Sequence, residues 1–190
     1  GTEIDSKSNC VEELCNGEVK NLAAAYRATG DKKYFDAASG GWDLYHENWQ
    51  HIGGSIAICE GTDLHPPKSY YLHRNTGELC GSIFWAFLNQ RFHLLNPNDE
   101  KYVAEIEKSI YNNLIANQVG SSGIRYHSVL VDHKDVNSRQ PFAMSTCCEG
   151  QGTRMMGALP EFIYSLTDNG VYVDLFTPSS VKFNTATGKV

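Results

Sequence analysis

The sequence predicts a mainly α fold made of paired helices, with the start of a β region at its C-terminal end. Two segments, 11–45 and 77–117, each contain two stretches with apolar residues at helical spacing. The turns inside them are alike, Gly-Asp-Lys-Lys-Tyr at 30–34 and Asn-Asp-Glu-Lys-Tyr at 98–102. Since repeated helical hairpins bury one another's apolar faces, this repeat indicates part of an α/α toroid or a solenoid. A closed toroid needs more helices than the sequence contains, so we expect the chain to belong to a larger domain.

The first hairpin is predicted to join helices at 11–28 and 33–45. Gly30 is a stop signal for the first helix, and Asp31 opens the second. The residues at helical spacing are Leu14, Val19, Leu22, Ala23 and Tyr26 in the first helix, and Tyr34, Ala37, Ala38, Trp42 and Tyr45 in the second.

The second hairpin is predicted to join helices at 77–95 and 99–117. Asn96 and Pro97 end the first of them, because proline cannot continue a helical hydrogen-bond ladder. The core face of the second helix consists of Val103, Ile106, Ile110 and Leu114.

Two stretches, 51–74 and 120–152, lack a helical period. The first is rich in Gly, Pro, His and Tyr, which predicts a long functional loop or a short strand pair. Within the second, residues 124–131 are typical of a strand. Both stretches are candidates to carry a functional site.

The C-terminal part is predicted to change from helix to strand. A helix at 153–166 would tolerate Pro160 near its middle only with a kink. Alternation of Val171, Val173 and Leu175 after a turn then predicts a strand.

Composition excludes several classes of partner. The 190 residues include 41% hydrophobic residues, enough for one buried core, and carry a formal charge of −6, which argues against binding to a nucleic-acid backbone. No apolar run approaches the roughly 18 residues that cross a bilayer, and no basic stretch followed by an apolar one opens the sequence. We therefore expect neither nucleic acid nor a membrane as partner, and no signal segment.

The common enzyme motifs are missing from the sequence: it contains no His-Glu-x-x-His zinc motif, no Gly-x-Ser-x-Gly elbow, no phosphate-binding loop and no dinucleotide fingerprint. Its most specific feature is the adjacent pair Cys147 and Cys148, just upstream of a predicted helix N-terminus that would stabilise thiolates. Adjacent cysteines rarely pair with each other, so a disulfide scaffold is not expected. The alternative is that one cysteine is simply a small buried apolar residue.

Glu78 and Cys80 form a second candidate pair, at the start of the helix predicted at 77–95. Alone, Asn75 and Glu78 are explained by a capping box without any metal. Together with Cys147 and Cys148, however, the pair offers three thiolates and one carboxylate, the number of ligands that fills a tetrahedral zinc site.

In combination, three sequence features resemble the β-L-arabinofuranosidase family, glycoside hydrolase family 127, and its relatives. They are Gly77-Glu78-Leu79-Cys80, the run at 99–114, and Cys147-Cys148 followed by Gly152-Thr153-Arg154. The resemblance extends from 53 to 179. It implies an (α/α)6 barrel followed by β-sandwich modules, and hence a division into 1–168, a partial catalytic barrel, and 169–190, the start of a β-sandwich region.

The resemblance also implies roles for individual residues. It implies zinc held by Glu78, Cys80, Cys147 and Cys148, with Cys147 as the nucleophile of a retaining, exo-acting furanosidase, and with a carbohydrate substrate. Glu60 matches the acid/base by its distance before Glu78, although by itself it is typical of a surface carboxylate. His51 and Tyr126 are similar to sugar-contacting positions.

Two other functions remain open at this stage. A non-catalytic carbohydrate-binding module could hold the same zinc as a structural ion, since four protein ligands are typical of structural sites. A cysteine hydrolase acting on amides would need a histidine bonded to the cysteine, and none adjoins Cys147 in the sequence. Solvent access to Cys147 separates the catalytic zinc site from the structural one.

Overall fold

The computed structural model describes residues 11–48, 50–54, 56, 76–120, 123–129, 147–167, 170–185 and 188–189. Its helices are α1 (Val11–Thr29), α2 (Lys32–Asn48), α3 (Leu79–Leu95), α4 (Lys101–Ser109), the π-helix η2 (Ile110–Ile115), α5 (Cys147–Ala158) and the 3-10 turn η3 (Leu159–Phe162). Its strands are β1 (Thr76–Glu78), β2 (His127–Val129), β3 (Tyr164–Thr167), β4 (Gly170–Val173), β5 (Asn184–Thr185) and β6 (Gly188–Lys189).

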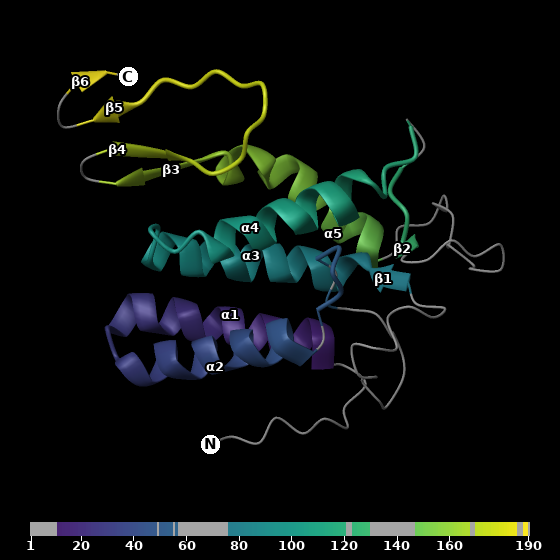
Figure 1. Ribbon diagram of the computed structural model, residues 1–190, viewed down its shortest axis with the longest axis horizontal. Coiled ribbons are helices and arrows are strands. Elements are labelled where there is room, and N and C mark those ends of the chain that lie inside the picture. The colour runs from purple at the N-terminus through teal and green to yellow at the C-terminus, as the bar shows by residue number, and fades with distance from the viewer. Residues whose placement is uncertain are drawn as a thin grey trace.

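Helix α3 lies at the centre, in contact with α1, α4 and α5 (Figure 1). Nearly every face of it is buried, because its sequence is apolar all round rather than on one stripe. The pair α1 and α2 packs below it in Figure 1, and α4 packs above it. The first hairpin expected from the sequence, α1 and α2, therefore packs against α3 of the second.

Two clusters of buried side chains hold the helices together. One joins α3 to η2 and α5 around Leu79, Ile83, Ile110, Leu114 and Met155. The other joins α1 and α2 to α3, and its largest members are the aromatic residues Trp42, Tyr45, Trp85, Phe92 and Tyr102. Gly30, with a φ of 71°, reverses the chain between α1 and α2, as the stop signal predicts.

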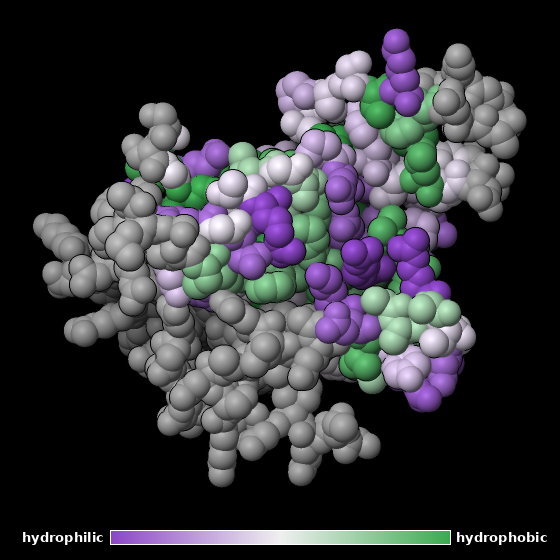
Figure 2. All heavy atoms as spheres, turned by 180° about the vertical axis from the view of Figure 1, so that it is seen from behind, coloured by the Kyte–Doolittle hydropathy of each residue, from purple (hydrophilic) through white to green (hydrophobic). Residues whose placement is uncertain are grey.

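Three antiparallel strand pairs complete the fold: β1 with β2, β3 with β4, and β5 with β6. The first lies at the N-terminal end of α3, and the β3–β4 hairpin lies at its other end (Figure 1). Apolar residues are exposed on the C-terminal strands and the segment after them, at the upper right of Figure 2. The most exposed of these is Phe176, at 84%.

The helix predicted at 153–166 differs from the structure at both ends. Helix α5 begins at Cys147 and ends at Ala158, and residues from Tyr164 form β3 instead. Pro160 has no backbone N–H and lies in the 3-10 turn that follows, so it ends the helix rather than kinking it. The strand predicted from Val171 exists as β4 and pairs with β3.

The second predicted hairpin also needs adjustment. Its first helix begins at Leu79, because residues 76–78 are extended and pair with β2. Its second helix begins at Lys101 and changes to a π-helix at Ile110. None of the helices that the structure describes is long and apolar enough to cross a bilayer.

Candidate metal centre

Glu78 lies at the junction of β1 and α3. Its backbone is extended, with φ of −72° and ψ of 131°, and is paired with His127 of β2. The next residue, Leu79, donates its backbone N–H to Tyr126 O at 3.0 Å. The capping-box explanation is therefore wrong: Glu78 immediately precedes the helix, and its side chain makes no capping hydrogen bond. The Glu78 carboxyl group instead accepts a hydrogen bond from the Cys148 thiol at 2.9 Å.

Cys80 follows in the first turn of α3 and is fully buried. Cys147 and Cys148 are the first two residues of α5. They belong to the helix itself, whereas the sequence predicted them upstream of it. Helix α5 approaches α3 closely at Gly152, where a Cβ atom would lie 3.1 Å from Leu79 Cδ2. This approach brings the first turns of the two helices together.

The four predicted ligand side chains meet at this point. Each residue contributes one ligand atom, and these four atoms all lie within 4.8 Å of one another. The residues are Glu78, Cys80, Cys147 and Cys148. Cys80 Sγ is 3.3 Å from Cys148 Sγ, and Cys148 Sγ is 2.9 Å from Glu78 Oε1. All three cysteines are thiols rather than disulfides.

These distances fit a tetrahedral zinc site. With Zn–S near 2.3 Å and Zn–O of about 2.0–2.2 Å, ligand atoms around one ion are about 3.5–3.8 Å apart. The observed separations, from 2.9 Å to at most 4.8 Å, lie on both sides of that range. Small side-chain rotations therefore suffice to place the four atoms around one ion.

The electrostatics of the cluster also favour a cation. Glu78, Cys80 and Cys148 are buried, and gathering acidic groups away from water is costly unless a positive charge compensates them. The hydrogen bond with Cys80 lowers the pKa of Cys148, but burial and the Glu78 carboxyl group outweigh it and raise that pKa overall. A divalent ion would reverse this effect, because it stabilises the thiolate.

Cys147 differs from the other three residues because its side chain is exposed. Its thiol lies 3.6 Å from the Tyr126 hydroxyl group, to which it donates a weak hydrogen bond. Tyr126, one of the two predicted sugar-contacting residues, thus lies beside the thiol of this exposed residue.

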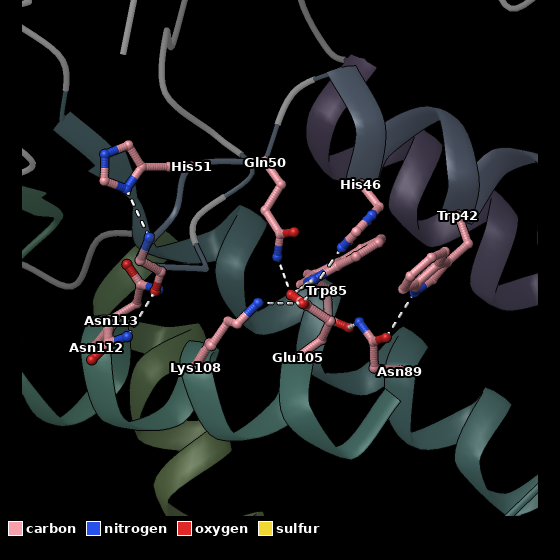
Figure 3. A network of polar contacts seen from close by, with 11 residues as sticks. Trp42, His46, Gln50, His51, Trp85, Asn89, Glu105, Lys108, Asn112 and Asn113 are labelled. Carbon is pink, nitrogen blue, oxygen red and sulfur yellow. Dashed lines mark hydrogen bonds and ion pairs between the residues drawn. The ribbon is translucent and has the colours of Figure 1, made fainter. Parts of the chain in front are cut away.

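His51, the other predicted sugar-contacting residue, lies in a turn after α2. Its Nδ1 accepts a hydrogen bond from Gly53 N at 3.0 Å, and burial lowers its pKa (Figure 3). Glu60, the predicted acid/base, lies outside the described residues.

A buried polar network around Glu105 was not expected from the sequence. The Glu105 carboxyl group accepts hydrogen bonds from Gln50 Nε2, from Trp85 Nε1 at 3.3 Å and from Lys108 Nζ at 2.7 Å (Figure 3). Glu105 falls between the apolar positions of α4, where a solvated charge is the ordinary expectation. The sequence does not identify its burial, because two of its three donors, Gln50 and Trp85, come from other segments.

Comparison with known proteins matches a family model to the part of the chain that contains the four candidate metal ligands. Residues 4–161 match the family model described as the β-L-arabinofuranosidase GH127 catalytic domain. The search of curated proteins gives no significant match.

Solved structures with the same fold include two GH127 enzymes. A GH127 β-arabinofuranosidase superposes with a TM-score of 0.82 at 24% identity, over 94% of this chain and 28% of its own. A GH127 β-L-arabinofuranosidase from Geobacillus stearothermophilus gives 0.73 at 18% identity, over 88% and 28%.

A third structure, named only as a glycoside hydrolase, gives a TM-score of 0.74 at 18% identity, over 94% of this chain and 34% of its own. The chain thus spans about a third or less of the length of these proteins. At these identities the likeness establishes the fold. It confirms the predicted mainly α architecture, a partial (α/α) barrel with strands at its C-terminal end. The division at residue 168 stays a prediction.

Proposed function

We propose, because this chain belongs to the GH127 β-L-arabinofuranosidase family, that it carries the centre of a zinc-dependent retaining glycoside hydrolase with a cysteine nucleophile. One observation carries the proposal. Three buried ligands, Glu78, Cys80 and Cys148, meet a fourth, Cys147, which is an exposed residue. A purely structural zinc site has no need of an exposed ligand, whereas a nucleophile must reach its substrate.

The four residues suit zinc in number and kind. Three thiolates and one carboxylate favour zinc over magnesium and calcium, which prefer oxygen ligands. When bound, zinc would supply positive charge that keeps Cys147 deprotonated at neutral pH.

In the proposed first step the Cys147 sulfur attacks the anomeric carbon of the sugar. A carbon–sulfur bond forms while the bond to the leaving oxygen breaks, and Glu60 donates its proton to that oxygen. In the second step the ionised Glu60 removes a proton from water. The water oxygen then bonds to the anomeric carbon, and Cys147 departs as the thiolate. Two inversions give net retention of configuration.

The neighbouring residues support the nucleophile in this scheme. Tyr126 lies within 3.6 Å of Cys147, so its hydroxyl group is close enough to orient the sulfur or to contact a sugar at the anomeric carbon. We propose β-L-arabinofuranosides or related plant-type sugars as the substrate, with Tyr126 and His51 as contact residues. An exo-acting furanosidase is the first activity to test.

The second candidate is a non-catalytic carbohydrate-binding module in which zinc is structural. The buried environment of three of the four ligands favours it, since buried ligands are typical of structural sites. The two functions differ in the fate of Cys147. A catalytic thiolate reacts with the sugar, whereas a structural ligand only holds the ion.

Metal analysis and a substrate screen test the proposal together. The protein should contain about one zinc per chain and release an aryl group from aryl β-L-arabinofuranosides. Iodoacetamide should modify Cys147 and abolish turnover, because only this ligand is exposed. A zinc-loaded protein that binds arabinofuranosides without hydrolysing them would favour the structural role instead. A metal-free protein would contradict both functions.

A further inference from the structure

A hollow lies between the C-terminal halves of α1 and α3. Its volume is about 360 Å³, within the range of small-molecule sites. Apolar side chains form most of its lining, and two arginines complete it. The lining residues are Ala23, Ala24, Ala28, Leu94 and Leu95, with Arg27 and Arg91. None of them belongs to the candidate metal centre, and about 16 Å of helix separates Cys80 from Arg91.

Helical spacing explains how α1 forms one wall of the hollow. Ala24 follows Lys20 by four residues, and Arg27 and Ala28 follow Ala24 by three and four, so all four share one side of the helix. Ala24 and Ala28 are exposed, and their side chains are short. They leave space beside the longer side chains of Arg27 and, on α3, of Leu94, which is 47% exposed.

Arg91 also belongs to a group of like charges. Lys20 Nζ lies 5.6 Å from the centre of the Phe87 ring, and Arg154 Cζ lies 4.5 Å from the centre of the same ring. Burial lowers the pKa of Lys20, and the charges of Arg154 and Arg91 lower it further, because the three cations repel one another. An anion beside Arg91 would relieve this repulsion.

These cations differ from the other basic residues in having no acidic partner. Several lysines elsewhere are ion-paired with an Asp or Glu: Lys32, Lys33, Lys101 and Lys108. Within the described part of the chain, no carboxyl group pairs with any of the four cations around the hollow, which are Lys20, Arg27, Arg91 and Arg154. Carboxyl groups are not scarce, since the sequence has 22 acidic and 16 basic residues.

Helix stability accounts for only one of the two arginines in the lining. Arg27 lies in the last turn of α1, where a cation interacts favourably with the helix dipole. Arg91 precedes the last turn of α3, beyond the reach of that effect. A guanidinium group forms two parallel hydrogen bonds with a carboxylate, so two arginines in one hollow suit an anion of this kind.

The shape of the hollow limits the size of its occupant. Beyond Arg91, the side chains of Lys20 and Arg154 lie over the Phe87 ring, which is only 9% exposed, so the chain itself fills that end. The remaining space suits a small ligand better than a helix lying along α1 and α3. A second copy of the same face is disfavoured, because it would bring like charges together.

We propose that the hollow between α1 and α3 is a binding site for a small organic carboxylate with an apolar body. Its carboxylate accepts hydrogen bonds from the guanidinium groups of Arg27 and Arg91, and its apolar part lies against Ala24, Ala28 and Leu94. Lys20 and Arg154 add positive potential without touching the ligand. The site depends neither on zinc nor on the proposed hydrolytic activity.

Three probes separate the contributions of charge and apolar surface. Phenylacetate has both features, phenylacetamide has nearly the same shape without the charge, and inorganic phosphate has charge without an apolar body. Calorimetry measures affinity, and the methyl signals of alanine-labelled protein report contact with Ala24 and Ala28. We expect phenylacetate to shift these two signals and to bind about tenfold more tightly than either of the other probes.

Substitutions then locate the site. Arg27→Gln and Arg91→Gln should each weaken phenylacetate binding about tenfold, because each removes a charged hydrogen-bond donor. Lys182→Gln is the control, since it removes an exposed cation of the C-terminal segment. Ala24→Leu should block the ligand by filling the hollow while both arginines remain. Zinc content and the unfolding midpoint are measured for every variant, and we expect the zinc content to be unchanged.

Several results would overturn the proposal. Equal affinity for phosphate and phenylacetate would remove the apolar part of the site, and unchanged phenylacetate binding in both arginine variants would place the carboxylate elsewhere. If Arg91→Gln fails to fold, Ala24→Leu still decides, because Ala24 is exposed and uncharged. Absence of phenylacetate binding, together with protection of Arg27 and Arg91 from phenylglyoxal, would mean that polypeptide covers the hollow instead.

Discussion

Adding one methyl group at the contact between α5 and α3 should weaken zinc binding although it touches no ligand. At Gly152 a new Cβ atom would lie 2.9 Å from Ile124 Cδ1 and 3.1 Å from both Ile124 Cγ2 and Leu79 Cδ2. Leu79 is fully buried and Ile124 is 8% exposed, so neither side chain has open space into which to move. We therefore expect helix α5 to shift, and Cys147 and Cys148 to shift with it.

The magnitude follows from two opposing terms. Overpacking a core by one methyl group costs about 1–3 kcal/mol, whereas replacing glycine by alanine inside a helix stabilises by about 1 kcal/mol. We expect Gly152→Ala to lower the free energy of unfolding by up to about 2 kcal/mol, or the melting temperature by up to about 8 °C. If the strain is relieved by separating the two helices, zinc affinity should fall about tenfold for each 1.4 kcal/mol.

Gly157→Ala is the matched control in the same helix. Gly157 is exposed and a Cβ atom there meets nothing within 4 Å, so the substitution should stabilise the protein by about 0.5–1 kcal/mol. Chemical unfolding with and without zinc, and competition with a chromophoric chelator, measure both effects. If Gly152→Ala stabilised the protein as much as Gly157→Ala and bound zinc equally well, the contact would not position the ligands.

Three further outcomes follow from the candidate metal centre. Glu78→Ala should lower zinc content and melting temperature together, because a bound ion would join α3 to α5, and full zinc occupancy in metal analysis would remove Glu78 from the site. Cys147→Ser should abolish turnover on aryl furanosides while leaving the fold intact, since a serine hydroxyl is a far weaker nucleophile than a thiolate. Residual turnover above about 1% would argue against Cys147 as the nucleophile. In the metal-free protein the pKa of Cys148 is raised, so the folded state holds its proton more tightly than the unfolded state does. Stability should therefore fall as pH rises through the ordinary thiol pKa, and a comparison with Cys148→Ala in urea titrations at several pH values isolates this effect.

The helical part of the fold could be predicted because its signals are local. Helices α1 and α2 follow the apolar spacing on either side of Gly30, whose positive φ satisfies the stop that the sequence indicates. The start of α5 could not be predicted in the same way. Its first residues, Cys-Cys-Glu-Gly-Gln-Gly, have poor helix propensity, and the packing of Gly152 against Leu79 overrides that preference.

The candidate site was predictable in its members but not in its geometry. The thiols of Cys80, Cys147 and Cys148 already indicate soft metal ligands and Glu78 adds a carboxylate, which is a matter of chemistry rather than of fold. That Glu78 is extended rather than helical depends on its pairing with a strand far along the chain. In the Glu105 network only the Lys108 contact is local, whereas the contacts with Gln50 and Trp85 are tertiary and no local pattern reports them.

The most direct test of the account is the covalent intermediate. Replacing Glu60 by glutamine would remove the proposed base that activates water, while an aryl leaving group can still depart without protonation, so the protein should accumulate a glycosyl intermediate. Intact-mass measurement of Glu60→Gln with an aryl β-L-arabinofuranoside should show one pentose-sized adduct, and peptide mapping should place it on Cys147. An adduct on another residue would contradict the assignment of the nucleophile. No adduct, together with a product of inverted configuration, would contradict covalent catalysis by cysteine.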